Sequence, residues 1–395
     1  MHTESPVGHA LTSAAVETPA FVIDDAKLTR NLKRGLDRAK ALGVTLRPHL
    51  KTHKSITIAR QQMEHLDGPA TVSTLEEARW FAERGVSDLI YAVGIAPQKL
   101  HEVARIRRSG CDLKIILDSA EAAKMVSDFC MAEGCVMPVL LEIDVDGHRS
   151  GLLPDADDLI DTAHALKHGA ILAGVLTHAG GSYDHEGVEA AKKAAENERA
   201  GIVKAAERLR QAGFLVDIVS AGSSPTFMAA ESMEGVTEIR AGVYAMGDLF
   251  QANLGTVGLD DIAGSVLCTV IGKKAEKGQL IVDAGWMAMS RDRGTANQHC
   301  DYGYGLVCDV EGVPLLGGNV VMSGANQEHG IITAREGYTL PLDLYPVGTR
   351  LRVLPNHACP TAAPYRTLLL VDGAGVVTDE IDHVRGWVLF SSQIA

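Results

Sequence analysis

A basic segment near the start of the chain contains a lysine suited to covalent chemistry. It reads Arg47-Pro48-His49-Leu50-Lys51-Thr52-His53-Lys54 and lies at the end of a β-type run, Val44–Pro48. Catalytic groups of parallel barrels gather at the C-terminal ends of strands. Partial burial and neighbouring cations favour the neutral, nucleophilic form of an amine, and therefore Schiff-base formation by Lys51. The same spacing also fits a solvated basic loop.

Two glycine-containing turns are candidates for holding a phosphate group. The first reads Ser220-Ala221-Gly222-Ser223-Ser224-Pro225-Thr226 and the second reads Arg240-Ala241-Gly242-Val243-Tyr244. Glycine lets the backbone approach an anion closely, and Ser223, Ser224 and Thr226 add hydroxyl donors. Either turn alone could be a simple connection, but their positions after the seventh and eighth candidate strands favour phosphate binding.

A third motif, Asn356-His357-Ala358-Cys359, could bind a metal ion. Residues two apart on an extended segment point to the same face, and an imidazole nitrogen and a thiolate are both good ligands for Zn²⁺. Two protein ligands leave room for water and substrate, which is what Lewis-acid catalysis needs. The alternative is a buried cysteine beside a hydrogen-bonded histidine.

Several other polar residues lie near strand ends but carry a weaker signal. Arg149 could hold a carboxylate or a phenolate oxygen, and His178 and Tyr183 lie at the end of another candidate strand. Arg291 and Gln327 belong to polar segments later in the chain and could contact a substrate. Each of these side chains could equally be an ordinary packed or surface residue.

The elements that would position these residues alternate regularly in the first part of the chain. Helical stretches rich in Ala, Glu, Lys and Leu separate eight short β-type runs, and several of these runs are continuously apolar, as in a parallel sheet buried on both faces. The pattern favours a (β/α)₈ barrel over an open doubly wound sheet, since no G-x-G-x-x-G follows the first strand. The runs are Val44–Pro48, Ala70–Ser73, Asp88–Ala92, Leu113–Leu117, Val139–Val145, Ala173–His178, Leu215–Ala221 and Val236–Ala241.

After about Leu249 the pattern changes to strand-like segments separated by Gly, Pro and Asn, which predicts a β-rich second domain. The expected strands there are Gly264–Gly272, Gln279–Asp283, Gly303–Asp309 and Thr349–Leu354. We therefore expect a barrel over residues 26–248 and a β-domain over residues 249–395. Residues 19–25 could join that β-domain, and residues 1–18 are expected to form a partly disordered leader.

Composition excludes some classes of function. The chain has 395 residues and a formal net charge of −13, which argues against a nucleic-acid partner. No apolar stretch approaches the ~20 residues needed to span a bilayer, and no secretory signal is evident. The seven cysteines are scattered without a CxxC pair, which predicts a reduced, cytoplasmic protein.

Taken together, the motifs resemble those of the fold-type III pyridoxal-phosphate enzymes, specifically the D-serine dehydratase and D-threonine aldolase group, with the bacterial D-threo-3-hydroxyaspartate dehydratases most similar in appearance. The resemblance extends from Thr18 to about Trp387. The motifs that carry it, in the expected order, are Arg47–Lys54, Val145–Gly151, Leu176–Tyr183, Gly222–Thr226, Asp283–Thr295, Gln327–Gly330 and Pro355–Thr361.

This resemblance implies an alanine-racemase-like barrel with a C-terminal β-domain, and a homodimer with the active site near the interface. It implies that Lys51 carries pyridoxal 5'-phosphate, with Arg149 and Tyr183 near its ring. The turns at Gly222 and Gly242 would hold the phosphate. His357 and Cys359 would bind a divalent metal, for which a cysteine ligand suggests Zn²⁺, while Mn²⁺ or Mg²⁺ stay open.

The implied reaction is the elimination of water from a D-β-hydroxy amino acid to give a keto acid and ammonia. Cys359 favours this dehydratase branch, because the aldolases of the group usually have an aspartate at the corresponding position. The alternative is aldolase cleavage to glycine and an aldehyde. An amino-acid racemase is less favoured, because it needs a second base on the opposite face of the cofactor and no metal. A non-catalytic pyridoxal-phosphate carrier is also less favoured, because such proteins resemble the barrel alone and lack the β-domain with its His-x-Cys pair.

Overall fold

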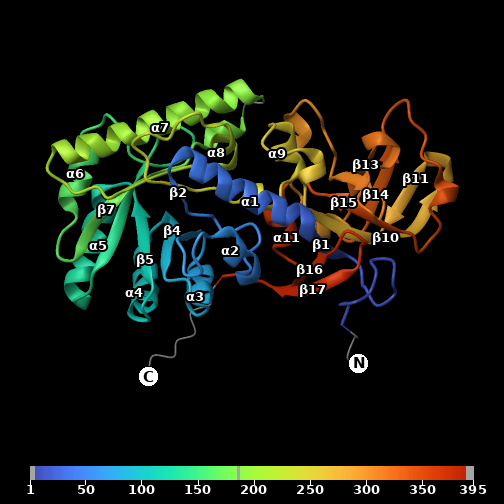
Figure 1. Cartoon of the computed structure of the whole chain (residues 1–395), viewed down its shortest axis with the longest axis horizontal. Helices are drawn as coiled ribbons and strands as arrows, with labels where there is room; N and C mark the ends of the chain where they lie inside the picture. Colours follow the sequence, from blue (N-terminus) through green and yellow to red (C-terminus); the bar gives the residue numbers. More distant parts are fainter. Residues whose placement is uncertain (1–4, 185–186, 388–395) are drawn as a thin grey trace. The chain divides into compact units, whose positions relative to one another are not determined.

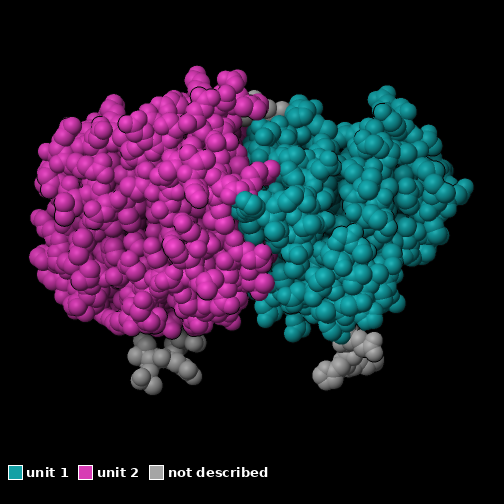
Figure 2. All heavy atoms as spheres, in the orientation of Figure 1, with its two compact units in different colours: residues 1–33, 243–383 teal, residues 34–242, 384–395 magenta. Residues whose placement is uncertain are grey.

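The computed structural model describes residues 5–184 and 187–387 and divides the chain into two compact units (Figure 2). Unit 1 comprises residues 1–33 and 243–383, and unit 2 comprises residues 34–242 and 384–395. The first division falls inside helix α1 (Asp25–Leu42), eight residues after the start expected for the barrel, and the second lies six residues before the expected end.

Unit 2 is built on eight parallel strands, as predicted (Figure 1). Their order in the sheet is β2-β9-β8-β7-β6-β5-β4-β3, and a parallel bridge between His49 and Thr71 joins the two end strands into a closed barrel. The strands are β2 (Thr45–Leu46), β3 (Ala70–Val72), β4 (Asp88–Gly94), β5 (Asp112–Leu117), β6 (Met137–Ile143), β7 (Ala170–Thr177), β8 (Ile218–Ala221) and β9 (Glu238–Ile239).

Helices follow most of these strands, and local sequence signals define their ends. Thr74 and Ser119 accept a backbone N–H as N-caps of α3 and α5, while Gly134 ends α5 in the left-handed conformation. The helices are α2 (Ile56–Gln62), α3 (Leu75–Ala82), α4 (Leu100–Arg108), α5 (Ala120–Glu133), α6 (Asp158–Ala165), α7 (Val188–Gln211) and α8 (Ser224–Ala229).

Unit 1 is the predicted β-rich domain. Its nine strands have the order β11-β14-β13-β12-β15-β10-β1-β16-β17, and an additional β10–β11 pairing closes six of them into a ring. The strands are β1 (Ala20–Asp24), β10 (Gly264–Lys274), β11 (Gln279–Val282), β12 (Leu306–Cys308), β13 (Val320–Ala325), β14 (Gly330–Ala334), β15 (Arg350–Leu354), β16 (Thr367–Val371) and β17 (Val377–Asp382). The helices described after residue 242 are α9 (Leu249–Asn253), α10 (Trp286–Met289) and α11 (Ala358–Ala362).

The N-terminal segment is part of this unit. Strand β1 lies between β10 and β16, so the expectation that residues 19–25 join the β-domain agrees with the pairing. Residues 1–4 lie outside the described residues, but part of the expected leader is packed: Leu11 and Val16 are buried against β16 and β17. Hydrogen bonds from Arg350 to the carbonyl groups of Ser13 and Val16 also hold the segment.

Candidate functional site

Lys51 directly follows an extended segment that continues β2. The N–H groups of Arg47 and His49 donate to the carbonyl groups of Ile239 and Ala241, and the Leu50 N–H donates to the carbonyl of Thr71. The segment is therefore fixed between the β9 side and the β3 side of the barrel. The Lys51 side chain itself is exposed, so its amine is accessible to a reactant.

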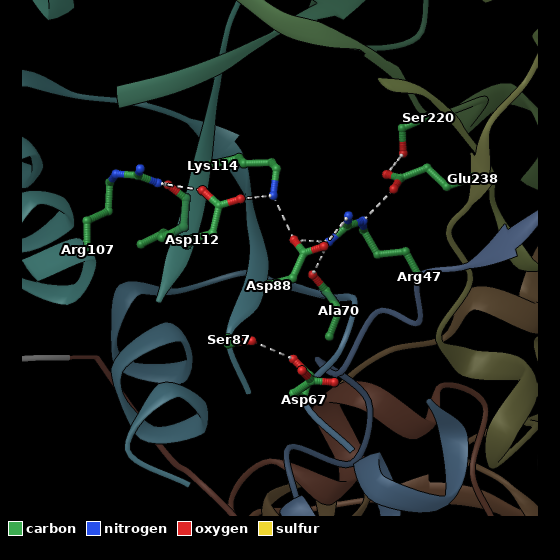
Figure 3. A network of polar contacts seen from close by, with 11 residues as sticks. Arg47, Asp67, Ala70, Ser87, Asp88, Arg107, Asp112, Lys114, Ser220 and Glu238 are labelled. Atoms are coloured by element: carbon green, nitrogen blue, oxygen red, sulfur yellow. Dashed lines mark hydrogen bonds and ion pairs between the residues drawn. The ribbon is translucent and has the colours of Figure 1, made fainter. Parts of the chain in front are cut away.

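The structure corrects the expected charge environment of this lysine. Arg47 is buried inside the barrel, where it binds Glu238 at 2.8 Å and Asp88 at 2.8 Å (Figure 3). Lys54 forms an ion pair with Glu77 at 3.1 Å, and His53 is buried and hydrogen-bonded to Gln62. Three of the four flanking cations are thus engaged with other partners.

The network around Arg47 joins the buried Arg47 and Lys114 to the more exposed Asp88 and Asp112 at the starts of β4 and β5. Lys114 binds Asp88 and Asp112, both at 2.7 Å, and Asp112 also binds Arg107 (Figure 3). Burial acts against the charge of Arg47, but Glu238 and Asp88 together raise its pKa. The motif residue Arg47 is therefore explained by the construction of the barrel.

The charge of Lys51 acts on two histidines, His49 and His178, and the charge of Arg240 acts on the same two residues. Burial, as the largest cause, and the charges of Lys51 and Arg240 together lower the pKa of His178 to about 3, against a hydrogen bond to Gly222 that raises it. Burial also lowers the pKa of His49 well below its ordinary value, with Lys51 as the next cause. Both imidazoles are consequently neutral at neutral pH.

The tautomer of His178 follows from its partner. Its Nδ1 lies 3.1 Å from the carbonyl oxygen of Gly222, which can only accept, so Nδ1 carries the proton. The Nε2 atom of His178 is therefore a hydrogen-bond acceptor. The ring of Tyr183 lies 6.0 Å from the His178 ring, so two of the predicted site residues are brought together. Arg149 is exposed and forms an ion pair with Glu142 at 3.2 Å.

The first predicted phosphate turn begins helix α8 and is tightly hydrogen-bonded within the fold. Ser223 and Thr226 form a capping box, and Ser223 is also within 3.0 Å of Ser182. The Gly222 N–H and the Thr226 hydroxyl both donate to Glu198. Ser224 is buried at the first position of the helix. Several of the donors assigned to the phosphate are thus used internally.

Glu198 is a residue that sequence reasoning missed. It is fully buried in α7 and accepts hydrogen bonds from Ala179, Gly222 and Thr226. Burial raises the pKa of Glu198, while these hydrogen bonds lower it. A usable signal existed, because Glu198 occupies the buried face of α7 otherwise formed by Ala191, Ala195, Ile202, Ala205, Ala206 and Leu209.

The second turn is close-packed at its glycine. A Cβ atom on Gly242 would lie 2.7 Å from the carbonyl oxygen of His49, so only glycine fits beside the Lys51 segment. Val243 and Tyr244, the other predicted contacts of the phosphate, are buried and belong to unit 1. They form a short 3₁₀ turn that ends at Ala245.

His357 and Cys359 lie in unit 1 and approach one another. The backbone of His357 is extended, but α11 begins at the next residue, so the expected extended segment is wrong beyond His357. Their side chains are nevertheless hydrogen-bonded. Burial acts to lower the pKa of His357, but hydrogen bonds to Asp292 and Cys359 raise it to about 11.

The donor set of this pair fits a divalent metal. The Nδ1 atom of His357 lies 2.8 Å from Oδ2 of Asp292, which leaves the other ring nitrogen for a metal beside the Cys359 thiol. Asp248 accepts the Ala358 N–H at 3.0 Å and fixes the backbone between the two residues. Among the residues that the structure describes, no three His, Cys, Asp or Glu side chains form a metal-binding group by themselves.

The two remaining predicted substrate contacts lie on the same unit. The Arg291 guanidinium lies 5.2 Å from the centre of the Trp286 ring and is exposed. The Gln327 side chain is exposed, while the backbone carbonyl oxygen of Gln327 accepts the Met287 N–H at 3.1 Å. Both residues are accessible to a small molecule.

None of the described helices is long and apolar enough to cross a bilayer.

Two family models match consecutive parts of the chain. The model for the N-terminal domain of alanine racemase matches residues 23–249, and the model for a serine dehydratase domain matches residues 263–371. The first match alone covers more than half of the chain. Their boundary agrees with the change from alternating to β-rich sequence near residue 249.

Similar proteins match over nearly their full length. The chain is 48% identical to a D-threo-3-hydroxyaspartate dehydratase from Delftia sp. (strain HT23), covering 95% of this chain and 99% of that protein. It is 29% identical to a D-serine dehydratase from Dictyostelium discoideum (94% and 98% covered) and 28% identical to a D-threonine aldolase from Arthrobacter sp. (93% and 92% covered).

The fold agrees with these matches. A solved structure of a cysteine-to-alanine variant of a D-threo-3-hydroxyaspartate dehydratase, described as its metal-free form, superimposes with a TM-score of 0.92 at 47% identity. That match covers 96% of this chain and all of the other. The chain therefore belongs to the fold-type III pyridoxal-phosphate enzymes, in the group that contains the D-serine dehydratases and D-threonine aldolases.

Proposed function

We propose that this protein is a pyridoxal-phosphate- and metal-dependent lyase that eliminates water from a D-β-hydroxy amino acid, giving a keto acid and ammonia. The observation that carries the proposal is that one chain holds both parts such a reaction needs. Lys51 lies beside neutral histidines at a barrel strand end, and His357 and Cys359 lie together in the β-rich unit. Similarity to a dehydratase over 95% of the chain supports it.

Lys51 would carry pyridoxal 5'-phosphate, which when bound withdraws electrons from the α-carbon of an attached amino acid. The exposed amine of Lys51 and the accepting Nε2 of His178 fit this group. Once displaced by the substrate amine, Lys51 would act as the general base that removes the α-proton. The neutral His49 and His178 add no positive charge beside Lys51.

We assign supporting roles to the other predicted residues. Arg149 and Tyr183 would contact the cofactor ring, and the Gly222 and Gly242 turns, with Ser223, Ser224, Thr226, Val243 and Tyr244, would surround its phosphate. His178, Arg291 and Gln327 would contact the substrate. The residues of the barrel, 26–248, would thus carry the cofactor, and residues 19–25 with 249–395 would carry the metal.

His357 and Cys359 would hold a divalent metal, which supplies Lewis acidity toward the substrate β-hydroxyl. A thiolate beside an imidazole favours Zn²⁺ over Mn²⁺ or Mg²⁺. The described metal-free form of a similar dehydratase supports a metal in this group. We further propose a cytoplasmic homodimer. A reduced protein is supported by the cysteines: all seven lie in the described part of the chain, and none of them is in a disulfide bond there.

The second candidate function is aldolase cleavage to glycine and an aldehyde. Similarity to a D-threonine aldolase over 93% of this chain favours keeping it. The higher identity to a dehydratase and the cysteine at position 359 both favour elimination. Racemase activity and a non-catalytic carrier are less supported, because neither uses His357 and Cys359.

One product assay separates these functions. The purified enzyme is incubated with D-serine, D-threonine and D-threo-3-hydroxyaspartate, with and without a chelator. We expect keto acid and ammonia from at least one substrate, and loss of this activity in chelator. Glycine with an aldehyde would establish the aldolase, and racemised substrate formed in chelator would establish the racemase. An absence of turnover with all three substrates would refute the proposal.

A further inference from the structure

A loop of unit 1, residues 289–295, is tied to the segment that contains the His-x-Cys pair. The Thr361 hydroxyl donates to the carbonyl of Met289, and the side-chain amide of the buried Asn356 donates to the carbonyl of Asp292. The Thr295 hydroxyl donates to the Asn356 side-chain oxygen. The loop is therefore held against residues 356–361 by hydrogen bonds other than the one to His357.

Within this loop Asp292 has both carboxylate oxygens committed. Its Oδ1 accepts the Gly294 N–H at 2.7 Å, and its Oδ2 lies 2.8 Å from Nδ1 of His357. Its own N–H donates to the hydroxyl of Ser290, a non-glycine residue with a φ of 72°. The backbone thus fixes one oxygen of the carboxylate and thereby aims the other at the imidazole.

We propose that Asp292 is a positioning residue for the metal site: it fixes the His357 tautomer with the proton on Nδ1 and turns the other ring nitrogen toward the metal. A carboxylate accepts but cannot donate, so Nδ1 must carry the proton. Histidine ligands of metals commonly donate their second N–H to such a group, which orients the ring and makes the ligand nitrogen more basic. This inference rests on the proposed metal role of His357 and Cys359.

The chain offers a matched control in the same region. Asp301 accepts the Gly303 N–H at 2.8 Å through Oδ1, the same local pattern as Asp292 and Gly294. Its Oδ2, however, binds Arg293 at 2.9 Å and does not contact His357. Removing Asp301 therefore removes a carboxylate of the same kind without freeing the imidazole.

The test measures Zn²⁺ affinity of the cofactor-loaded enzyme by competition with a chromophoric chelator. We expect Asp292→Ala to weaken Zn²⁺ binding about 10- to 100-fold. We expect Asp301→Ala to stay within about twofold of the parent enzyme. The cofactor absorbance and the thermal midpoint show whether each variant is folded. Equal affinity of Asp292→Ala and the parent enzyme would overturn the inference.

A second variant keeps the loop intact. In Asp292→Asn the side-chain oxygen still accepts the Gly294 N–H, so the NH₂ group must face Nδ1 of His357. That contact demands an unprotonated Nδ1 and places the proton on the metal-facing nitrogen. We therefore expect Asp292→Asn to bind Zn²⁺ at least as weakly as Asp292→Ala, and retained affinity would contradict the tautomer argument.

Co²⁺ spectra distinguish a positioning residue from a direct ligand. With saturating Co²⁺, Asp292→Ala should keep the d–d and thiolate charge-transfer bands of the parent enzyme, because the coordination geometry is unchanged. Altered d–d bands would make Asp292 a ligand and overturn the proposal. If the parent enzyme and His357→Ala bind Zn²⁺ equally weakly, the proposed metal site itself is wrong. If the parent enzyme binds Zn²⁺ tightly and Asp292→Ala binds it equally tightly, only the positioning role of Asp292 is wrong.

Discussion

His178 combines a fixed tautomer with a shifted pKa, and this combination has a measurable consequence. Its pKa is about 3 in the folded protein, against an ordinary value of 6.5. Below pH 6.5 the unfolded chain therefore binds a proton that the folded chain does not. Stability that is fully present above pH 6.5 is progressively lost as the pH falls toward 3.

Replacing this histidine should reduce the sensitivity to acid. We expect cofactor-free His178→Gln to lose stability less steeply than the parent protein between about pH 4 and pH 6, by up to one proton in the slope. The measurement is the urea midpoint at a series of pH values. Identical slopes for the two proteins would mean that His178 is protonated in the folded state.

Glu198 is the residue on which the first glycine turn depends. Truncation to alanine would leave two buried N–H groups and one hydroxyl without their acceptor, at a cost of about 1–3 kcal/mol for each group. We expect Glu198→Ala to lower the free energy of unfolding by about 3 kcal/mol or more. Glu196→Ala on the same helix removes only a surface pair with Arg199 and should change it by about 0.5 kcal/mol or less. Urea unfolding compares the two, and similar losses would contradict this role.

Residue types predicted part of the candidate site. Lys51 and the His-x-Cys pair could be singled out because few side chains perform their chemistry. Asp292 and Glu198 could not, because aspartate and glutamate are common surface residues and their roles come from partners 65 and up to 28 positions away. Arg47 was counted among the cations next to Lys51 because the two residues are close in the sequence. The sequence does not show that the Arg47 side chain points into the barrel, where its partners Glu238 and Asp88 lie.

At the scale of elements, the turn after β8 is fixed by glycine. Gly222 has a φ of +130°, and a Cβ atom there would lie 2.3 Å from the carbonyl oxygen of Arg240. Gly213 also has a positive φ, +91°, but nothing lies within 4 Å of its Cβ position. An alanine at Gly213 would therefore add only backbone strain, whereas an alanine at Gly222 would add both backbone strain and steric overlap.

We expect Gly213→Ala to cost roughly 1–2 kcal/mol of unfolding free energy, the usual cost of a left-handed backbone. Gly222→Ala should cost several kcal/mol more, because β8 and β9 must move apart, and it should also weaken cofactor binding. Thermal midpoints and cofactor absorbance provide the comparison. Equal midpoints for the two variants would show that the turn can relax.

Element prediction succeeded where one physical signal dominated. Strands β5 and β6 are mostly apolar and almost entirely buried, and α7 has a long helical pattern. It was weaker where an element is short: β2 and β9 have two residues each, and their register comes from neighbouring strands. The first turn of α11 was expected to be extended, since five residues are too few to show helical periodicity.

At the scale of the whole molecule, the residues proposed to hold the cofactor lie mainly in unit 2, with Val243 and Tyr244 in unit 1, and those proposed to hold the metal lie in unit 1. Lys51 belongs to unit 2, and His357, Cys359 and Asp292 belong to unit 1. Each unit has its own closed ring of strands, so the two groups should be loaded independently while turnover needs both.

We therefore predict a crossed pattern. Lys51→Ala should lose the visible absorbance of the bound cofactor but keep Zn²⁺ affinity within about twofold. His357→Ala should keep that absorbance but bind Zn²⁺ at least about 100-fold more weakly, since a ligand and not its orienting partner is removed. Both variants should lack elimination activity, whereas Lys54→Ala, which removes only a pair with Glu77, should keep both groups. Absorbance titration and chelator competition on the same samples provide the test, and loss of both groups in either variant would show that the two units do not load separately.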